Sequence, residues 1–197
     1  MHGLINYGLQ KFFQAVHGEE IWSRIVAQGA LPRDGFEPML TYDDHLTEAM
    51  LAAAETVLGE KRVDFLEDFG TFLVAHPLCK PVRRLLRFGG ESYEDFLHSV
   101  EELGDRARLA LPDLDLPQLV LEEAGAGRYA VRCRWNRPGF VPVIVGILRA
   151  LADDYGALVL VEAAGAPPEA REAKIAVTLL DGAFASGRAF SLGVLRE

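Results

Sequence analysis

Hydrophobic residues recur every three or four positions through the first half of the chain, which places them on one face of a helix. Glycines and prolines fall between these stripes, where helices commonly stop. Residues 30–43, with three such punctuating residues, are expected to form a loop. The pattern predicts two helices in residues 3–29, broken near His17-Gly18, and further helices in residues 45–58, about 63–75 and 82–88.

The run from Tyr93 to Pro117 has the clearest amphipathic pattern, and the rest of the chain is organised around it. It predicts one helix that ends before Pro112. Its apolar arc holds Phe96, Leu97, Val100, Leu103, Gly104, Ala107 and Leu111. Gly104 is unexpected there, because a glycine inside a helix costs about 1 kcal/mol relative to alanine. Either another helix packs closely against it, or a ligand approaches the backbone.

After this run the period changes to that of strands. Two strands, Leu119–Glu123 and Tyr129–Trp135, are expected to form a hairpin through Gly125-Ala126-Gly127. A helix should begin at Pro138 and run to Leu151. Two further strands are predicted, residues 158–162 and 174–180, around the turn Gly165-Ala166-Pro167-Pro168. Helices first and strands later, with one helix inserted, indicate an α+β fold.

Composition narrows the class of protein. A chain of 197 residues is long enough for one domain with a sizeable core. Its 29 acidic and 20 basic residues give a formal charge of −9, which argues against a nucleic acid partner. No apolar run is long enough to span a membrane, and the first residues do not resemble a secretory signal. Two cysteines make no disulfide framework, so we expect a cytoplasmic protein.

Several short motifs occur together in a fixed order. The pattern F-L-x-x-V-E-x-L-G-D ends at Asp105, Pro117 follows Gly104 by thirteen residues, and Arg137 lies in C-R-W-N-R-P-G-F. With M-x-G-L-I-N at the start, then G-E-E-I-W and F-G-x-F, the chain resembles the heme nitric oxide/oxygen-binding (H-NOX) family. The resemblance implies a helical half packed on a four-stranded antiparallel sheet with an inserted helix, and a buried heme. It divides the single domain into a helical subdomain of about 1–60 and a pocket and sheet subdomain of about 61–197.

The resemblance also assigns site positions. In the family a histidine ligates the heme iron where this chain has Gly104, and glycine has no donor atom. Pro117 matches the proline that packs on the porphyrin. In the motif that holds the propionates, Cys133 replaces tyrosine and Trp135 replaces serine, while Arg137 is kept. Residues 133, 135 and 137 should share one strand face. Arg137 could bind a carboxylate of a ligand or pair with a local acid.

No other residue replaces the missing ligand convincingly. His98 lies about 120° from Gly104 around the predicted helix, among charged neighbours, and is expected at the surface. His76 and Cys79 have a spacing that could bind a metal, but two ligands do not close a site, and Cys133 is a remote third candidate. We find no P-loop, dinucleotide fingerprint or nucleophile elbow. We expect three pairs of adjacent acids to be solvated or to cap helices: Asp43-Asp44, Glu101-Glu102 and Asp153-Asp154. We expect the phenylalanines of the third helix to lie in the core: Phe65, Phe69 and Phe72.

Three functions fit these observations. The first is a non-enzymatic sensory or regulatory module whose heme pocket is degenerate or holds another apolar ligand. The second is a nitric oxide or oxygen sensor that binds heme without the histidine. The third is a protein-interaction scaffold whose pocket Trp135 fills. The family implies a signalling enzyme as partner: a histidine kinase, a cyclase or a cyclic-dinucleotide enzyme. A pocket anchored on Arg137 would be lined by Leu4, Ile5, Phe72, Leu103, Val143 and Ile147.

Overall fold

The computed structural model of the chain describes residues 1–163 and 170–190. It divides into two compact units, Met1–Phe69 and Gly70–Glu197, so the division falls inside the third helix. The predicted turn at Gly165 to Pro168 lies outside the described residues. Each unit is described by itself below.

The first unit is helical, as the apolar stripes predict. Helix α1 (Gly3–Gln28) is interrupted at Gly18, whose φ of 88° and ψ of 164° are not helical, which confirms the predicted break. Helix α2 (Asp44–Leu58) begins after Asp43, whose carboxylate caps it, and ends at Gly59 in the left-handed conformation. Helix α3 (Arg62–Ala75) starts in this unit. Its Phe65 and Phe69 are buried and pack on Phe13 and Phe12 of α1.

The predicted single helix from Tyr93 to Leu111 is wrong, because the chain breaks it after one and a half turns. Helix α5 (Tyr93–His98) is followed by a 3₁₀ turn, η2 (Val100–Glu102), and by α6 (Leu103–Ala110). The break falls at Ser99. Its hydroxyl donates to the Phe96 carbonyl at 2.9 Å, and the Arg106 guanidinium donates to the Ser99 carbonyl at 2.9 Å. A serine that bonds the local backbone competes with the helical ladder, and periodicity does not register that competition.

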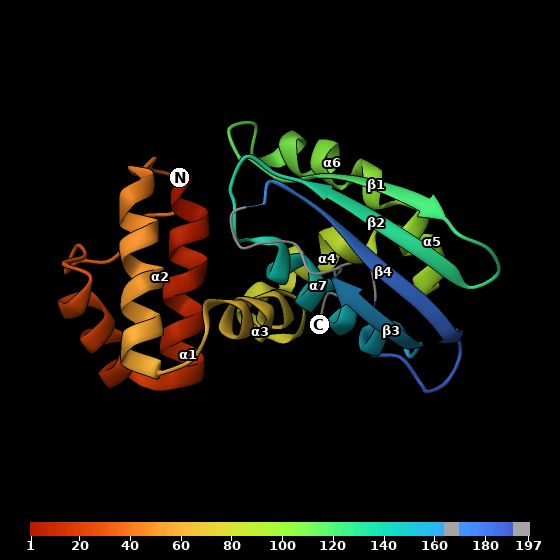
Figure 1. The fold of residues 1–197 in the computed structure, drawn as a ribbon, viewed down its shortest axis with the longest axis horizontal. Helices are drawn as coiled ribbons and strands as arrows, with labels where there is room; N and C mark the ends of the chain where they lie inside the picture. The colour runs from red at the N-terminus through yellow and green to blue at the C-terminus, as the bar shows by residue number, and fades with distance from the viewer. Residues whose placement is uncertain (164–169, 191–197) are drawn as a thin grey trace, which may run out of the picture. The chain divides into compact units, whose positions relative to one another are not determined.

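The second unit contains the four-stranded antiparallel sheet, which confirms the α+β prediction. Its strands are β1 (Gln118–Glu123), β2 (Arg128–Arg134), β3 (Leu158–Ala163) and β4 (Glu172–Asp181). They lie side by side in the order β1-β2-β4-β3 (Figure 1). Val131 and Cys133 of β2 pair with Ile175 and Ala173 of β4, and all four side chains are buried on one face of the sheet.

Helix α7 (Val141–Tyr155) supplies much of the core against that face, through Ile144, Leu148 and Leu151. It begins three residues later than predicted, because Gly139 takes a φ of 84° and Phe140 precedes the first turn. The 3₁₀ turn η1 (Pro77–Cys79) and helix α4 (Lys80–Arg87) lie between α3 and α5. Asp154 corrects a second expectation. It is 1% exposed and pairs with two arginines of α4, whereas its neighbour Asp153 is exposed as expected.

Candidate ligand site

Gly104, the second residue of α6, has room for a side chain. A Cβ built there would have the guanidinium of Arg108 as its nearest described neighbour, at 3.5 Å to Nη2 and 3.8 Å to Nη1. Contacts of 3.5–3.8 Å are ordinary van der Waals separations, and the far end of an arginine can move aside. Close packing against another helix therefore does not explain this glycine.

The side chain that covers Gly104 is a cation. Arg108 follows Gly104 by four residues, so the two positions lie on the same face of the helix. Its guanidinium is half exposed and forms an ion pair with Asp105 one turn back. The space that a side chain at position 104 would enter is thus bordered by a positive charge, which is a poor neighbour for a metal cation.

The strand positions Cys133 and Trp135 differ in surroundings. Cys133 is fully buried in the core of the second unit, and this burial raises the pKa of its thiol to about 11. Strand β2 ends at Arg134, so Trp135 follows the strand instead of continuing its face as expected. The Trp135 amide still donates to the Arg171 carbonyl at 2.8 Å, and its ring meets Phe140 edge to face with centroids 5.5 Å apart.

Arg137 forms an ion pair with a local acid. Its Nε lies 3.2 Å from Oδ2 of Asp115, and its side chain is 18% exposed. Pro117, two residues after Asp115, is buried. Sequence reasoning missed Asp115, although a carboxylate two residues from the matched proline was a visible candidate. Of the two roles open to Arg137, the structure contains the pairing with a local acid.

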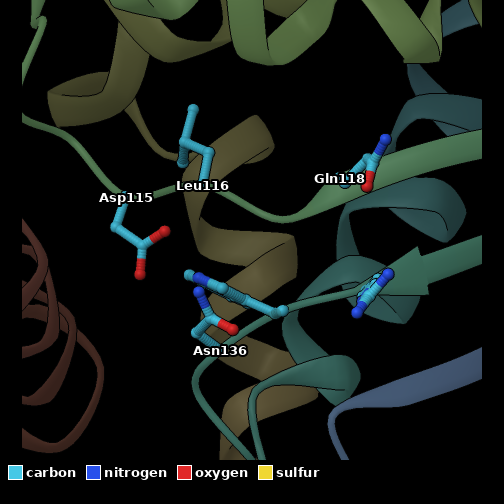
Figure 2. Close-up of a pocket in the computed structure, with 6 residues that line it drawn as sticks. Asp115, Leu116, Gln118 and Asn136 are labelled. Atoms are coloured by element: carbon cyan, nitrogen blue, oxygen red, sulfur yellow. The ribbon is translucent and has the colours of Figure 1, made fainter.

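A small polar pocket opens beside this ion pair. It has a volume of about 260 Å3 and is lined by Asp115, Leu116, Gln118, Arg134, Trp135 and Asn136. Figure 2 shows Asp115 and Leu116 on the segment that leads into β1, Gln118 at the start of β1, and Asn136 on the segment after β2. Trp135 is 7% exposed, and its Nε1 is buried without a hydrogen-bond partner. This pocket is too polar to be the apolar pocket that the sequence predicts.

Comparison with known proteins decides the family. The sequence profile described as Haem-NO-binding (HNOB) matches residues 2–163, which is most of the chain. The chain belongs to the Haem-NO-binding family. Domains of this family are sensor modules and are not themselves catalytic, which agrees with the lack of catalytic motifs in the sequence.

Relatives of this HNOB chain include soluble guanylate cyclases of animals. Soluble guanylate cyclase gcy-31 of Caenorhabditis elegans is 21% identical over 154 residues, which are 78% of this chain and 22% of that protein. Soluble guanylate cyclase 89Db of Drosophila melanogaster is 22% identical over 155 residues, 79% of this chain and 23% of that protein. The chain thus spans between a fifth and a quarter of these relatives, so HNOB domains occur within larger signalling enzymes.

Solved H-NOX structures share the fold. An Fe(II) unliganded H-NOX protein from K. algicida superposes with a TM-score of 0.79 at 17% identity, covering 92% of this chain and 98% of that one. An H-NOX mutant protein from S. oneidensis in the Fe(II) state gives a TM-score of 0.78 at 16% identity, covering 92% and 97%. The predicted H-NOX fold is therefore confirmed.

The pocket that the sequence predicts for this HNOB domain draws on both units. Leu4 and Ile5 lie on α1 in the first unit, and the other four residues lie in the second. There, Leu103 and Ile147 pack partly buried against the core, and Phe72 stacks on His76 with ring centroids 4.4 Å apart. A pocket that unites all six residues stays a prediction.

The remaining candidate ligands have other roles. His98 is half exposed, and its Nδ1 lies 3.8 Å from a Glu123 carboxylate oxygen, so it is a surface residue as predicted. Nδ1 of His76 accepts a hydrogen bond from the Leu78 amide and caps η1. Burial raises the pKa of the Cys79 thiol. Among residues 1–163 and 170–190, no three His, Cys, Asp or Glu side chains gather in a metal-binding arrangement, and no helix is long and apolar enough to cross a membrane.

Proposed function

We propose that this HNOB domain is a non-enzymatic sensory or regulatory module whose heme pocket no longer supports histidine ligation. The observation that carries the proposal is the room beside Gly104. Packing does not require glycine at this position, because a Cβ there would make only ordinary van der Waals contacts with its nearest neighbour, Arg108. Loss of an axial-ligand side chain would leave a space of this kind.

The residues at the matched positions do not fit a histidine-ligated heme. Glycine offers no donor atom, and the nearest side-chain atoms to a Cβ at this position belong to the Arg108 guanidinium, which cannot ligate a cation. Cys133 is part of the core in place of a phenolic donor. Arg137 keeps its charge but shares it with Asp115. Because iron ligation and propionate binding are affected together, no step of the function is assigned to heme.

The matched propionate end favours a self-filled site over one rebuilt for a new ligand. Trp135 is buried against Phe140, and Cys133 is closed into the sheet core. An empty cavity costs stability in proportion to its volume, so a site without a ligand tends to be filled by side chains. A retained apolar ligand with a carboxylate, such as a fatty acid or an iron-free tetrapyrrole, is the alternative occupant.

The module would pass its state to a signalling enzyme. Relatives that contain the domain are guanylate cyclases by name, and a histidine kinase or a cyclic-dinucleotide enzyme is an equivalent partner in the proposal. We place the protein in the cytoplasm, because both of its cysteines are unpaired thiols.

Heme loading tests the proposal. After expression with ample heme and gel filtration, the protein should show little or no heme absorption, including the Soret band, in a spectrum from about 350 to 650 nm. Only burial of the porphyrin would hold the heme, with a hydrophobic free energy of about 25 cal/mol per Å2 of buried apolar surface. Gly104→His should restore heme weakly, and Gly104→His with Cys133→Tyr and Trp135→Ser should restore it further. A His98→Ala change serves as the control and should alter none of these spectra.

Two results would contradict the proposal. A stoichiometric Soret band in the unaltered protein would show that heme binds without the histidine. Full loading by Gly104→His alone would show that Trp135 and Cys133 do not obstruct the porphyrin. Native mass spectrometry, with thermal shifts against fatty acids and porphyrins, separates a retained ligand from a self-filled site.

A further inference from the structure

Helix α4 is strongly basic in an acidic chain. Four of its eight residues are cations: Lys80, Arg83, Arg84 and Arg87. The whole chain carries a formal charge of −9, so this helix is a local exception. A region of opposite charge on an otherwise acidic protein creates a directed electrostatic field that selects and orients charged partners.

A buried carboxylate holds two of these arginines in place. Nε of Arg83 donates to both oxygens of Asp154, at 3.0 and 3.1 Å, and Nη1 of Arg87 reaches the same carboxylate at 3.3 Å. Arg87 also lies over the ring of Tyr155, with 3.8 Å between its Cζ and the ring centroid. Two cations thus share one carboxylate, and their side chains are fixed by it instead of moving freely in solvent.

The basic face borders a cavity of about 180 Å3. Lys80, Arg83 and Arg84 line one part of it, and Ala189 and Phe190 of the C-terminal segment line the rest. None of these five residues is acidic. Arg83 joins the two sides, since its Nη2 donates to the Ala189 carbonyl at 3.2 Å and its Cζ lies 5.6 Å from the Phe190 ring centroid. Cationic side chains of α4 and the aromatic ring of Phe190 therefore meet at one cavity.

We propose that this cavity is the docking site for an acidic peptide segment of a partner protein. A carboxylate of the segment would enter between the α4 cations, and an adjacent apolar residue would pack on Phe190. The mixed lining favours this occupant over a bare inorganic anion, because two of the five lining residues, Ala189 and Phe190, are apolar. The inference rests on the proposed function, because it needs the partner protein that this function implies.

The test measures binding of a fluorescein-labelled peptide of alternating glutamate and leucine by fluorescence anisotropy, at low and at high salt. Lys80→Glu with Arg84→Glu reverses the cavity charge and leaves Arg83 and Asp154 in place. The matched control, Arg33→Glu with Lys61→Glu, makes the same charge change at exposed positions of the first unit. Thermal unfolding by circular dichroism checks that both variants fold.

We expect salt-sensitive peptide binding that weakens about tenfold or more in the α4 variant and stays within about twofold in the control. Absence of binding by the unaltered protein, or equal loss in both variants, would overturn the proposal. So would binding of phosphatidylserine vesicles, or of inorganic phosphate in place of the peptide, that depends on Lys80 and Arg84. The heme spectrum reports separately on the proposed function, since none of these changes touches Gly104, Cys133, Trp135 or Arg137.

Discussion

Two glycines of the second unit, Gly70 in α3 and Gly104 in α6, have different reasons to be there. At Gly70 of α3, a Cβ would lie 2.2 Å from the Val143 carbonyl oxygen and 3.0 Å from Cα of Gly146. At Gly104 of α6, the nearest atoms that a Cβ would meet belong to the movable end of Arg108, at 3.5 Å or more. The first glycine is required because the backbones of α3 and α7 touch, and the second is not required by any contact of this kind.

The contrast separates fold from function. Gly70 belongs to the F-G-x-F motif, and the structure gives that motif a packing reason: without a side chain, α3 can approach α7 directly. Gly104 belongs to the motif that the resemblance matches to the family's iron-ligand position, and it has no such packing reason. A contact in the fold thus accounts for the glycine of one motif, whereas the proposed loss of the iron ligand accounts for the glycine of the other.

The largest effect is expected at the first glycine. Gly70→Ala should destabilise the protein by about 2–3 kcal/mol, because the new methyl group would overlap main-chain atoms of α7 that cannot move independently. Urea unfolding followed by Trp135 fluorescence, in a Trp22→Phe background, reports on the second unit. An unchanged midpoint would mean that α3 and α7 do not cross as closely as described, and the comparison would fail.

An intermediate effect on stability is expected at Cys133, in the core of the second unit. Its folded thiol pKa of about 11 lies above the ordinary value of 9.0. The buried neutral thiol therefore contributes stability that is complete below pH 9 and is lost as the pH rises toward 11, because the unfolded chain releases the proton first.

Between about pH 8 and pH 10 this loss should amount to about 1 kcal/mol. Cys133→Ala, which removes the titrating group, supplies the reference: the stability difference between the unaltered protein and this variant should narrow as the pH rises. A difference that stays constant over this range would place Cys133 in contact with water, and the matched site would then be open instead of closed into the core.

Much of the fold follows from local patterns. The period of the apolar residues located all the strands and most helices, and Gly18 and Gly59 marked real interruptions, because these signals depend on the chain itself. Expectations failed where a specific side-chain hydrogen bond or ion pair decided the outcome. Ser99 breaks a helix with the help of Arg106, and Asp154 is buried because Arg83 and Arg87, some seventy residues earlier, neutralise it.

The site stays a prediction. The resemblance to the H-NOX motifs, and not the periodicity of the chain, brought Gly104, Pro117 and Arg137 into one hypothesis. The partner of Arg137 could not be foreseen from periodicity, since Asp115 lies on an irregular segment whose course depends on tertiary contacts. The expected shared face of residues 133, 135 and 137 was wrong because β2 ends at Arg134.

The smallest effect, and the one that sharpens the comparison most, is expected at the second glycine. Gly104→Ala should stabilise the protein by about 0.5 kcal/mol: alanine is about 1 kcal/mol better than glycine inside a helix, and position 104 lies in the first turn, where the gain is smaller. The same substitution at Gly70 is the matched control and should have the opposite sign under identical urea unfolding. A sign difference between two glycine-to-alanine changes in helices of one unit cannot come from helix propensity, which is shared, and must come from the space around each position. If Gly104→Ala destabilises the protein as Gly70→Ala does, there is no room beside Gly104. The inference that a ligand side chain was lost there would then be wrong.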